Sequence, residues 1–486
     1  MSELPVGWAE TTLGEVADWG SGGTPSRSEP SFYGGTIPWI KSGELNSRYV
    51  TTTEEFITEA AIKNSSAKLF PAGSVAIAMY GATIGKTAIL GVDASTNQAC
   101  AVGAPSEGII GKEFLYRLLQ NEKEAFIEKG KGGAQPNISQ AVIKAHGVNL
   151  PPLVEQTRIV QKLDELLAQV DTLKARIDTI PALLKRFRHS VLAAAVSGRL
   201  TDEWRATKQE PAINLDSLED VSRTRRGVPQ NVKLPDELDS LEKPDSWVWC
   251  SAAKLLKKGV FVDLKDGNHG ANHPKTIEFT AEGLPFITAA NVADHGAIDY
   301  LNAPKVSGDA LAKLRVGFSD PGDVIFTHKG TVGRVAINTQ KCVLTPQTTY
   351  YRINPRILSN KYLSIYLRSN RFLAQTDAIK SQTTRDFIPI TAQYELFHLI
   401  PPLNEQSEVV RRIEQLFAFA DQLEAKVASA KSRIDHLTQS ILAKAFRGEL
   451  VPQDPNDEPA SVLLERIKAQ RAAAPKAKRG QKGVRV

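Results

Sequence analysis

One long stretch occurs twice in this chain, and the second copy begins 250 residues after the first. The first copy starts with Leu150-Pro151-Pro152-Leu153-Val154-Glu155-Gln156, and the second starts with Ile400-Pro401-Pro402-Leu403-Asn404-Glu405-Gln406. The offset, 401 − 151 = 250, holds without a gap as far as Leu200 and Leu450. Solenoid repeats recur every ~20–50 residues. The long period therefore indicates a duplicated module made of one globular domain followed by one long helix.

Both copies carry apolar residues at alternating spacings of four and three, a pattern that predicts helices packed along a seam. The predicted seam residues are Leu163, Leu166, Val170, Leu173, Ile177 and Leu184 in the first copy, and Ile413, Leu416, Leu423, Val427, Ile434 and Leu437 in the second. Pro181 lies inside the first helix, where a proline removes a backbone hydrogen bond and clashes with the preceding turn. We therefore expect a kink or a break near residues 178–179, and a helix end near Gly198.

The order of the segments predicts the topology. If the two seams pack together, the second helix runs back toward the first domain, so the helices are antiparallel and a pseudo-two-fold axis relates the two halves. Residues 159–191 then span ~50 Å at 1.5 Å per residue, which corresponds to roughly 15 bp of B-DNA. A generic dimerisation coiled coil is the alternative for the same pattern.

The predicted fold class is α+β, with two mixed, strand-rich globular domains joined by two long antiparallel helices. Short apolar runs broken by Gly, Pro, Asn and Ser indicate many short strands in both domains. The predicted segments are a first domain (1–149), a first helix (150–200), a polar connector (201–246), a second domain (247–398), a second helix (399–450) and a C-terminal segment (451–486). The proline-rich connector reads as a segment that need not pack. After a short helix at residues 461–471, we expect the basic tail to be disordered.

Composition excludes several classes of protein. Three isolated cysteines (Cys100, Cys250 and Cys342) offer neither a disulfide framework nor a CxxC pair, which favours a reducing compartment. The N-terminal residues lack the features of a signal peptide, and no apolar run approaches the ~20 residues of a membrane span. We therefore expect a cytoplasmic protein. The net charge of +6 does not itself argue for nucleic acid, because residues 466–486 carry eight basic residues and 52 basic residues face 54 acidic ones elsewhere.

Two motifs look catalytic, but the sequence argues against both. Residues 81–87 resemble a phosphate loop, yet they are one residue short and are followed by a predicted strand, whereas a phosphate loop needs a helix N-terminus. The matching residues 331–335 share a threonine, a glycine turn and a basic residue, Arg334 in place of Lys86. This pattern suits a hairpin that presents a cation to a DNA phosphate or a guanine edge, with a plain tight hairpin as the alternative. His269 and His273 have no third ligand at metal spacing, so no metal site is predicted.

The repeated motifs resemble those of a known family, the specificity subunit of type I restriction-modification systems. The resemblance covers nearly the whole chain and is carried by Pro151-Pro152-Leu153-x-Glu155-Gln156, by the motif at residues 185–200, by the copies at 401–406 and 440–450, and by the turn at 266–270. It implies a non-catalytic subunit with two target-recognition domains, each reading one half of a bipartite DNA target. The helices would set the spacer and dock two adenine-N6 methyltransferase (M) subunits, and motor-nuclease (R) subunits would join that core. S-adenosylmethionine, ATP and Mg²⁺ would then belong to the partners, with no cofactor on this chain.

Polar, basic and aromatic residues in the predicted loops are the candidates for DNA contact. They are Lys41, Tyr80, Thr83, Lys86, Gln135 and Asn137 in the first domain, and Asn291, His328, Lys329, Thr331, Arg334, Gln382, Thr384 and Arg385 in the second. For each of them, a solvated turn is the alternative. Two other functions stay open at this point: a single-chain DNA methyltransferase or nuclease, and a coiled-coil assembly protein without DNA contact. The sequence shows no set of catalytic residues for the former.

Overall fold

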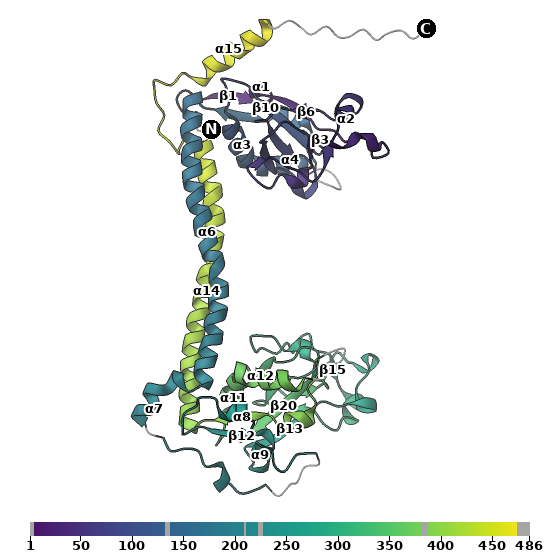
Figure 1. Ribbon diagram of the computed structural model, residues 1–486, viewed down its shortest axis with the longest axis vertical. Helices are drawn as coiled ribbons and strands as arrows, with labels where there is room; N and C mark the ends of the chain where they lie inside the picture. The colour runs from purple at the N-terminus through teal and green to yellow at the C-terminus, as the bar shows by residue number, and fades with distance from the viewer. Residues whose placement is uncertain (1–3, 132–136, 209, 222–226, 381–385, 474–486) are drawn as a thin grey trace. The chain divides into compact units, whose positions relative to one another are not determined.

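The computed structural model describes residues 4–131, 137–208, 210–221, 227–380 and 386–473. Residue contacts divide the chain into two compact units, shown with their elements in Figure 1. Unit 1 comprises Met1–Asp178 and Ala428–Val486, and unit 2 comprises Thr179–Val427. The division cuts through both long helices, α6 (Leu153–Val196) and α14 (Leu403–Phe446), whereas the sequence predicted boundaries at the helix ends.

Unit 1 contains three β-sheets, with strand orders β1-β11, β2-β10-β7-β8-β4 and β5-β3-β9-β6. Its strands are β1 (Ala9–Thr12), β2 (Ala17–Ser21), β3 (Tyr33–Ile40), β4 (Tyr49–Val50), β5 (Phe56–Ile57), β6 (Leu69–Phe70), β7 (Val75–Ala78), β8 (Thr87–Leu90), β9 (Ala94–Thr96), β10 (Cys100–Pro105) and β11 (Gly147–Leu150). Its shorter helices are α1 (Leu13–Val16), α2 (Glu59–Asn64), α3 (Lys112–Asn121), α4 (Lys123–Gly130), α5 (Gln140–Lys144) and α15 (Ala460–Ala473), with 3₁₀ turns η1 (Pro30–Phe32), η2 (Ser42–Glu44) and η3 (Gly81–Thr83).

Unit 2 repeats this plan with sheets ordered β12-β21, β13-β20-β17-β18 and β15-β14-β19-β16. Its strands are β12 (Val248–Ser251), β13 (Phe261–Asp266), β14 (Leu284–Ile287), β15 (Lys305–Val306), β16 (Phe318–Ser319), β17 (Val324–Thr327), β18 (Val335–Ile337), β19 (Cys342–Leu344), β20 (Thr348–Ile353) and β21 (Phe397–Ile400). Its shorter helices are α7 (Asp202–Lys208), α8 (Asp236–Asp239), α9 (Ala252–Lys257), α10 (Gly308–Ala312), α11 (Asn360–Leu367), α12 (Asn370–Ile379) and α13 (Ile390–Gln393), with 3₁₀ turns η4 (Arg199–Thr201), η5 (Leu215–Ser217), η6 (Gly270–Asn272), η7 (Thr276–Glu278) and η8 (Ala289–Asn291).

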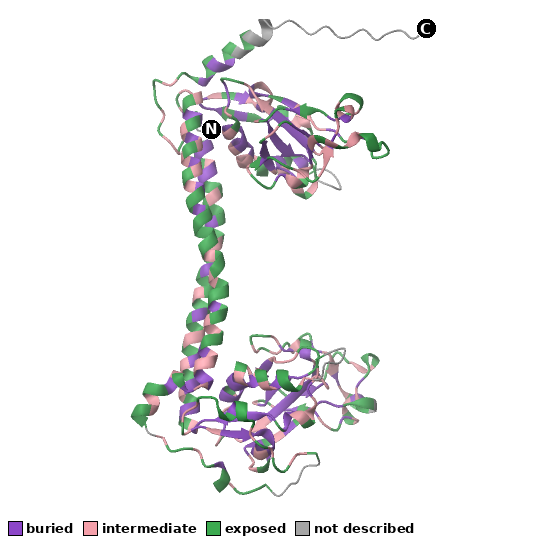
Figure 2. Ribbon diagram, in the orientation of Figure 1, coloured by how far each residue is buried: buried purple, intermediate pink, exposed green. Residues whose placement is uncertain are grey.

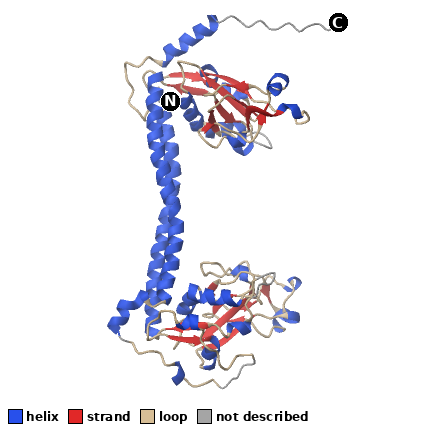
Figure 3. Cartoon of the chain, in the orientation of Figure 1, coloured by secondary structure: helices blue, strands red, loops and turns tan. Residues whose placement is uncertain are grey.

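The central strands of each unit are covered on both faces. Every residue of β7 and of β17 is buried. Buried residues, drawn in purple in Figure 2, gather on the strands of each unit. Such unbroken apolar runs are typical of strands that have no solvent face. In each unit the strands lie beside helices, drawn in red and blue in Figure 3. The mixed, strand-rich α+β class predicted from the sequence is confirmed.

Within each unit, α6 and α14 run antiparallel. Lys174 pairs with Asp435 at 3.3 Å in unit 1, and Arg188 pairs with Asp421 at 2.6 Å in unit 2. In both pairs the two residue numbers add to 609, as an antiparallel register requires. Each helix has 44 residues and is therefore ~66 Å long at 1.5 Å per residue.

Of the kink or break predicted near residues 178–179, the break is wrong, because α6 continues through Pro181 as one helix. The kink stays a prediction. Pro181 is exposed, so its ring contacts solvent. Ile177 packs against the core of unit 1, and Leu184 is buried on the other side of the proline. Side-chain packing on both sides of Pro181 therefore compensates for the one backbone hydrogen bond that the proline removes.

Two of the twelve predicted seam residues are wrong: Leu173 and Leu437 are 47% and 45% exposed. The other ten are buried or half-buried. The most buried positions recur every seven residues, as at Val427, Ile434 and Ile441. A pair of helices covers one stripe on each partner, so the second apolar position of the heptad lies at the margin of the interface.

The interpretation of residues 201–246 as a segment that need not pack is wrong. Leu215 and Leu238 are buried in the core of unit 2, and Lys258 donates to the carbonyl of Leu218 at 2.7 Å. The C-terminal segment packs in a similar way on unit 1, where Leu464 is buried and Arg158 pairs with the carboxylate of Asp457. The short helix predicted at residues 461–471 is confirmed as α15, and residues 474–486 lie outside the described part of the chain.

The glutamate of the repeated motif anchors each long helix to its own domain. Glu155 is buried and accepts a hydrogen bond from the indole of Trp8 at 3.1 Å. Glu405 is buried and accepts one from the indole of Trp247 at 2.8 Å. Since a buried charge is costly unless it is hydrogen-bonded, each of these glutamates depends on its indole partner.

The glutamine of the motif holds the segment that precedes α3 or α11. In unit 1, Gln156 accepts from the amide of Gly111 at 3.0 Å and donates to the carbonyl of Ile109. In unit 2, Gln406 accepts from the amide of Ser359 at 2.7 Å and donates to a carbonyl in the same way. These matching bonds align the two units with an offset of 359 − 111 = 248 at this point of the chain.

The glycine that ends each long helix is required by both its backbone and its neighbour. Gly198 and Gly448 have φ values of +81° and +76°, a left-handed conformation that favours glycine. A Cβ atom would lie 2.3 Å from Pro244 at Gly198 and 2.4 Å from Pro5 at Gly448. The end of each helix therefore packs closely on a proline that stands three residues before the indole partner of the glutamate.

Asp164 of α6 links unit 1's helix to its domain. It accepts from Arg48 at 2.8 Å and from Arg117 at 2.7 Å. Burial raises the pKa of Asp164, but the two guanidinium groups lower it more, so the net pKa lies below its ordinary value. The counterpart in unit 2 is a single exposed pair between Glu414 and Lys361, at 2.7 Å.

Asp164→Asn should lower the free energy of unfolding by about 1–2 kcal/mol, because part-buried Arg117 loses its carboxylate and Arg48 keeps only its pair with Glu113. Glu414→Gln, the matched control, should cost less than about 0.5 kcal/mol, since exposed pairs contribute little. Urea denaturation at pH 7 measures both. The penalty of Asp164→Asn should shrink as the pH falls and the carboxylate of the parent chain becomes protonated. Equal effects of the two variants would contradict the assignment.

Candidate nucleic-acid interface

The hairpin between β7 and β8 brings together most of the residues predicted to contact DNA in unit 1. Tyr80 forms a backbone bridge with Asn137, and its side chain is 43% exposed. Thr83 is exposed and donates from its hydroxyl to the carbonyl of Tyr80 at 2.8 Å. Gly81 and Gly85 have positive φ values of +61° and +78°, which allow the chain to reverse here. The predicted hairpin, with a strand after it instead of a phosphate-loop helix, is confirmed.

The loop that contains η2 lies at both basic candidates of unit 1: Lys41 belongs to it, and Lys86 bonds to it. The ammonium of Lys86 donates to the side-chain oxygen of Asn46 at 2.8 Å, two residues after η2. Lys41, just before η2, pairs with Glu55 at 2.5 Å. Arg27 and Lys41 together lower the pKa of Glu55 to about 2, so this carboxylate is charged at neutral pH. Lys41 is therefore partly neutralised by its neighbour, and Lys86 is oriented by a neutral amide.

The hairpin between β17 and β18 gives the same arrangement in unit 2. Lys329 forms a backbone bridge with Phe387, and its ammonium lies 5.3 Å from the centre of that ring. Thr331 is exposed at the tip. Arg334 donates from Nε to Asp294 at 2.6 Å and from Nη1 to the carbonyl of Val292 at 3.0 Å. The guanidinium is thus held in one orientation, with its Nη2 group not engaged in these two bonds.

Two candidates of unit 2 have structural roles. The side-chain oxygen of Asn291 accepts from both the amide and the hydroxyl of Thr288, at 3.0 and 2.7 Å, and so caps η8. His328 is completely buried, with Nδ1 at 2.9 Å from the carbonyl of Ile388. A ring without exposed surface cannot touch a base edge in this conformation, so for His328 the structure disagrees with the prediction of DNA contact. Gln135, Gln382, Thr384 and Arg385 lie outside the described residues.

The residues that orient the basic side chains were missed in the sequence. Asn46 holds Lys86 and Asp294 holds Arg334, and each follows the 3₁₀ turn after an equivalent strand, β3 or β14. The turns themselves share a backbone plan, since the residue before each turn accepts from the backbone amide of its third residue: Lys41 from Glu44, and Thr288 from Asn291. A comparison of the two copies in this loop could have located these partners.

The described residues offer no site for metal or thiol chemistry. No group of three or more His, Cys, Asp or Glu side chains that could hold a metal ion occurs in the described part of the chain. Burial raises the pKa of Cys100, Cys250 and Cys342 to about 12, so these thiols stay protonated and are poor nucleophiles. None of the described helices has the length and apolar character needed to cross a membrane.

Comparison with known proteins agrees with the duplicated plan. The family model for the type I restriction modification DNA specificity domain matches residues 5–182 and 277–430. The type I restriction enzyme EcoDI specificity subunit of Escherichia coli is 32% identical, with 97% of each chain covered. The EcoBI specificity subunit of the same species is 33% identical over 75% of this chain and 72% of its own length. The fold is also similar to that of the HsdS subunit from Thermoanaerobacter tengcongensis, with a TM-score of 0.58 at 20% identity and coverage of 92% and 98%. The chain belongs to the family of type I restriction-modification DNA specificity subunits.

Proposed function

We propose that this chain is the non-catalytic subunit that selects the DNA sequence for a type I restriction-modification complex. Each unit would read one half of a bipartite target, and the helices would fix the unread spacer. The observation that carries this proposal is the duplication of a complete reading unit, including a hairpin whose basic residue, Lys86 or Arg334, is held in place by a neighbouring loop. Two such units in one chain suit two half-sites, because a prearranged donor reads a base edge best.

The decisive experiment is to map methylated adenines in a host that expresses this chain with its partner subunits. Two methylated half-sites separated by a fixed spacer are expected. Exchanging residues 247–398 for those of a relative should change one half-site and leave the other unchanged. Methyl transfer by this chain alone would instead support a single-chain methyltransferase. Failure to bind any duplex with the partners present would support an assembly protein.

Arg334→Ala should weaken binding to the cognate duplex by about 5- to 100-fold, the range of a lost bidentate base contact of roughly 1–3 kcal/mol. Filter binding or fluorescence anisotropy with cognate and scrambled duplexes measures this. If Arg334 reads a base, the variant loses discrimination between the cognate and the scrambled duplex. If it contacts a phosphate, the slope of the logarithm of the binding constant against the logarithm of the salt concentration becomes shallower by about one. Arg356→Ala, at an exposed arginine just after β20, is the control. Equal effects of the two variants would refute the assignment.

The exposed residues of the long helices support docking of two copies of a methyltransferase subunit. Leu173 and Leu437 are exposed at the same level of unit 1's helix pair, close to the Lys174–Asp435 ion pair. Positions 173 + 250 and 437 − 250 are Leu423 and Phe187 in unit 2, both half-buried. Apolar residues thus stand at equivalent places, exposed in unit 1 and half-buried in unit 2, and equivalent apolar surfaces suit two identical partners.

Leu173→Asp should remove one methyltransferase copy from the complex, and Leu423→Asp should remove the other, because each variant places a charge in an apolar interface. Native mass spectrometry of the reconstituted complex gives the number of copies directly. Ala175→Asp, at an exposed position on the opposite face of α6, is the control. Two copies retained in both leucine variants would contradict this docking surface.

We further propose that S-adenosylmethionine, ATP and Mg²⁺ are bound by the partner subunits, including the motor-nuclease, and not by this chain.

A further inference from the structure

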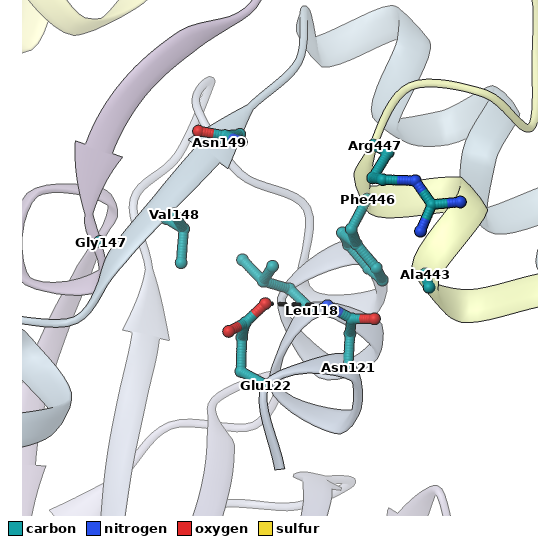
Figure 4. Close-up of a pocket in the computed structure, with 9 residues that line it drawn as sticks. All are labelled: Leu118, Asn121, Glu122, Gly147, Val148, Asn149, Ala443, Phe446 and Arg447. Atoms are coloured by element: carbon teal, nitrogen blue, oxygen red, sulfur yellow. Dashed lines mark hydrogen bonds between the residues drawn. The ribbon is translucent and has the colours of Figure 1, made fainter. Parts of the chain in front are cut away.

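A small pocket in unit 1 lies between the end of α3, the edge of β11 and the last turn of α14. Its volume is about 300 Å³, and the residues that line it are Leu118, Asn121, Glu122, Gly147, Val148, Asn149, Ala443, Phe446 and Arg447. Figure 4 shows Leu118, Phe446 and Val148 turned toward one another, with the carboxylate of Glu122 beside them. We call this place the β11 site. At the low end of the roughly 300–1,000 Å³ typical of ligand pockets, it has room for one long side chain.

The equivalent place in unit 2 is closed by unit 2's own side chains along β21. The hydroxyl of Tyr366 donates to the carbonyl of Phe397 at 2.9 Å, and that of Tyr362 donates to the carbonyl of Leu399 at 2.8 Å. Gln375 both donates to and accepts from the backbone of Phe397, at 3.0 and 2.9 Å. All four residues of β21 are buried. The outward backbone groups of this strand are therefore paired.

In unit 1 those side chains are missing. With the offset of 248 that the matching glutamines define, the positions of Tyr362 and Tyr366 are occupied by Phe114 and Leu118, which have no hydroxyl. Gly147 and Asn149 are exposed, and no described side chain donates to their carbonyls or accepts from their amides. An unpaired strand edge of this kind is a ready site for another chain.

The two units differ in the same way at the end of the long helix. In unit 2, the guanidinium of Arg371 reaches across this region and donates to the carbonyl of Val196, in the last turn of α6, at 3.0 Å. The counterpart carbonyl, at position 196 + 250, belongs to Phe446 of α14, and no described residue donates to it. A helix C-terminus carries partial negative charge and favours a cation. Unit 2 supplies that cation from its own α12, and unit 1 does not.

Glu122 gives the β11 site a carboxylate. The ring of His146 lies between two charged groups, with Nδ1 at 2.6 Å from the ammonium of Lys129 and Nε2 at 2.8 Å from the carboxylate of Glu122. Burial raises the pKa of Glu122, but His146 and Asn121 lower it more, so Glu122 keeps its charge at neutral pH. Arg447 is bound to Glu449 at 2.8 and 2.9 Å and adds no free positive charge. The site therefore combines a carboxylate, a helix C-terminus and an open strand edge.

We propose that the β11 site receives an arginine or lysine side chain of the methyltransferase subunit that docks on unit 1, from a segment that lies along the β11 edge. This inference rests on the proposed function. The basic side chain takes in trans the position that Arg371 takes within unit 2, and the backbone of the partner pairs with Gly147 and Asn149. The two units thus bind their partners differently at this point, with one site filled from within and the other filled by the partner.

A partner-independent measurement tests the chemistry of the site. 4-Fluorophenylalanine incorporated at position 446 of the full chain reports on the site by ¹⁹F NMR, during titration with N-acetyl-L-arginine methylamide and with the neutral N-acetyl-L-citrulline methylamide. We expect a saturable shift with the arginine compound and about tenfold weaker binding of the citrulline compound. Glu122→Gln should weaken binding of the arginine compound to the affinity of the citrulline compound. Glu124→Gln, which changes an exposed acid on α4, should leave binding of the arginine compound unchanged. Equal binding of both compounds, or no saturable shift, overturns the proposal.

A second measurement identifies the occupant. Leu118→Tyr supplies in unit 1 the hydroxyl that closes the edge in unit 2, and it fills the pocket. With methyltransferase subunits present, Leu118→Tyr and Glu122→Gln should each weaken binding of one copy by about tenfold or more, whereas Glu124→Gln should bind two copies normally. Thermal unfolding confirms that the variants are folded. Unchanged binding of both copies in both variants overturns the proposal and leaves the proposed function intact. If the parent chain binds no methyltransferase subunit, the proposed function fails, and the occupant named here fails with it.

Discussion

Glu405→Gln should lower the free energy of unfolding of unit 2 by about 3 kcal/mol, the range expected when one member of a buried ion pair is removed. Glu405 has no exposed surface and accepts four hydrogen bonds. They come from Thr201 at 2.7 Å, from Arg205 Nε and Nη2 at 2.9 and 2.8 Å, and from Trp247 at 2.8 Å. An amide has one acceptor oxygen, so in the variant at least one of these donors faces an N–H group and loses its partner.

Glu155→Gln is the matched control, and its cost should be less than about 1 kcal/mol. The Oε2 atom of Glu155 is buried without a partner, and Oε1 accepts only from Trp8 and, at 3.4 Å, from Gln453. Burial raises the pKa of Glu155 above its ordinary value, against the effect of these two hydrogen bonds. A neutral amide keeps the bond from Trp8 and removes an ill-compensated charge. Hydrogen–deuterium exchange separates the two units, and similar losses in both variants would show that Arg205 does not make the difference.

His398→Val should abolish an acid sensitivity of unit 2 that the parent chain shows below pH 6.5. His398 has no exposed surface, and neither ring nitrogen has a hydrogen-bond partner among the described residues. Aromatic rings surround it, with centroids at 5.1 Å for Phe261, 5.4 Å for Phe372, 5.7 Å for Tyr366 and 6.0 Å for Tyr351. Burial lowers the pKa of His398 to about 3, and the backbone of Leu396 opposes this effect only in part.

The direction of the pH effect follows from which state binds the proton. Between about pH 6.5 and pH 3, the unfolded chain protonates His398 and the folded chain does not. The free energy of unfolding should therefore fall by ~1.4 kcal/mol for each pH unit below 6.5. The counterpart at 398 − 250 is Val148, so valine is the residue that the duplicate carries. Urea midpoints of unit 2 between pH 7 and pH 4, with His189→Val on the exposed surface of α6 as a control, measure the slope. Parallel pH profiles of parent and His398→Val chains would contradict the role of His398.

Features that repeat in the sequence were predicted well, because local chemistry and the fixed offset determine them. The two long helices, their glycine ends and the hairpins before Lys86 and Arg334 all depend on residues close together in the chain. Features that depend on which distant residue a side chain contacts were not predicted from the sequence. The sequence shows Pro181 as a helix breaker, but packing at Ile177 and Leu184 maintains the helix.

The candidate interface shows the same limit. Arg334 was identified from its place in a hairpin, but its ion pair with Asp294 joins residues forty positions apart and has no local signature. His328 follows an apolar strand and looks like a loop residue, yet the segment containing Ile388 covers it. Leu173 fits the heptad as well as Val170 does, and only the number of helices in the bundle decides that Val170 is buried and Leu173 is exposed.

Unit 1 is built from two separate segments of the chain, and this affects the order in which the two units can fold during synthesis. Unit 2 is one continuous segment and can fold as soon as residue 427 has emerged, but the core of unit 1 includes Ile434, Ile441, Phe446 and Leu464. Synthesis of the 249 residues between Asp178 and Ala428 takes roughly 12–50 s at about 5–20 residues per second. During that interval the nascent N-terminal domain exposes an apolar face that only the end of its own chain can cover. A truncation near residue 430 would therefore damage the first domain to be made and leave the second intact.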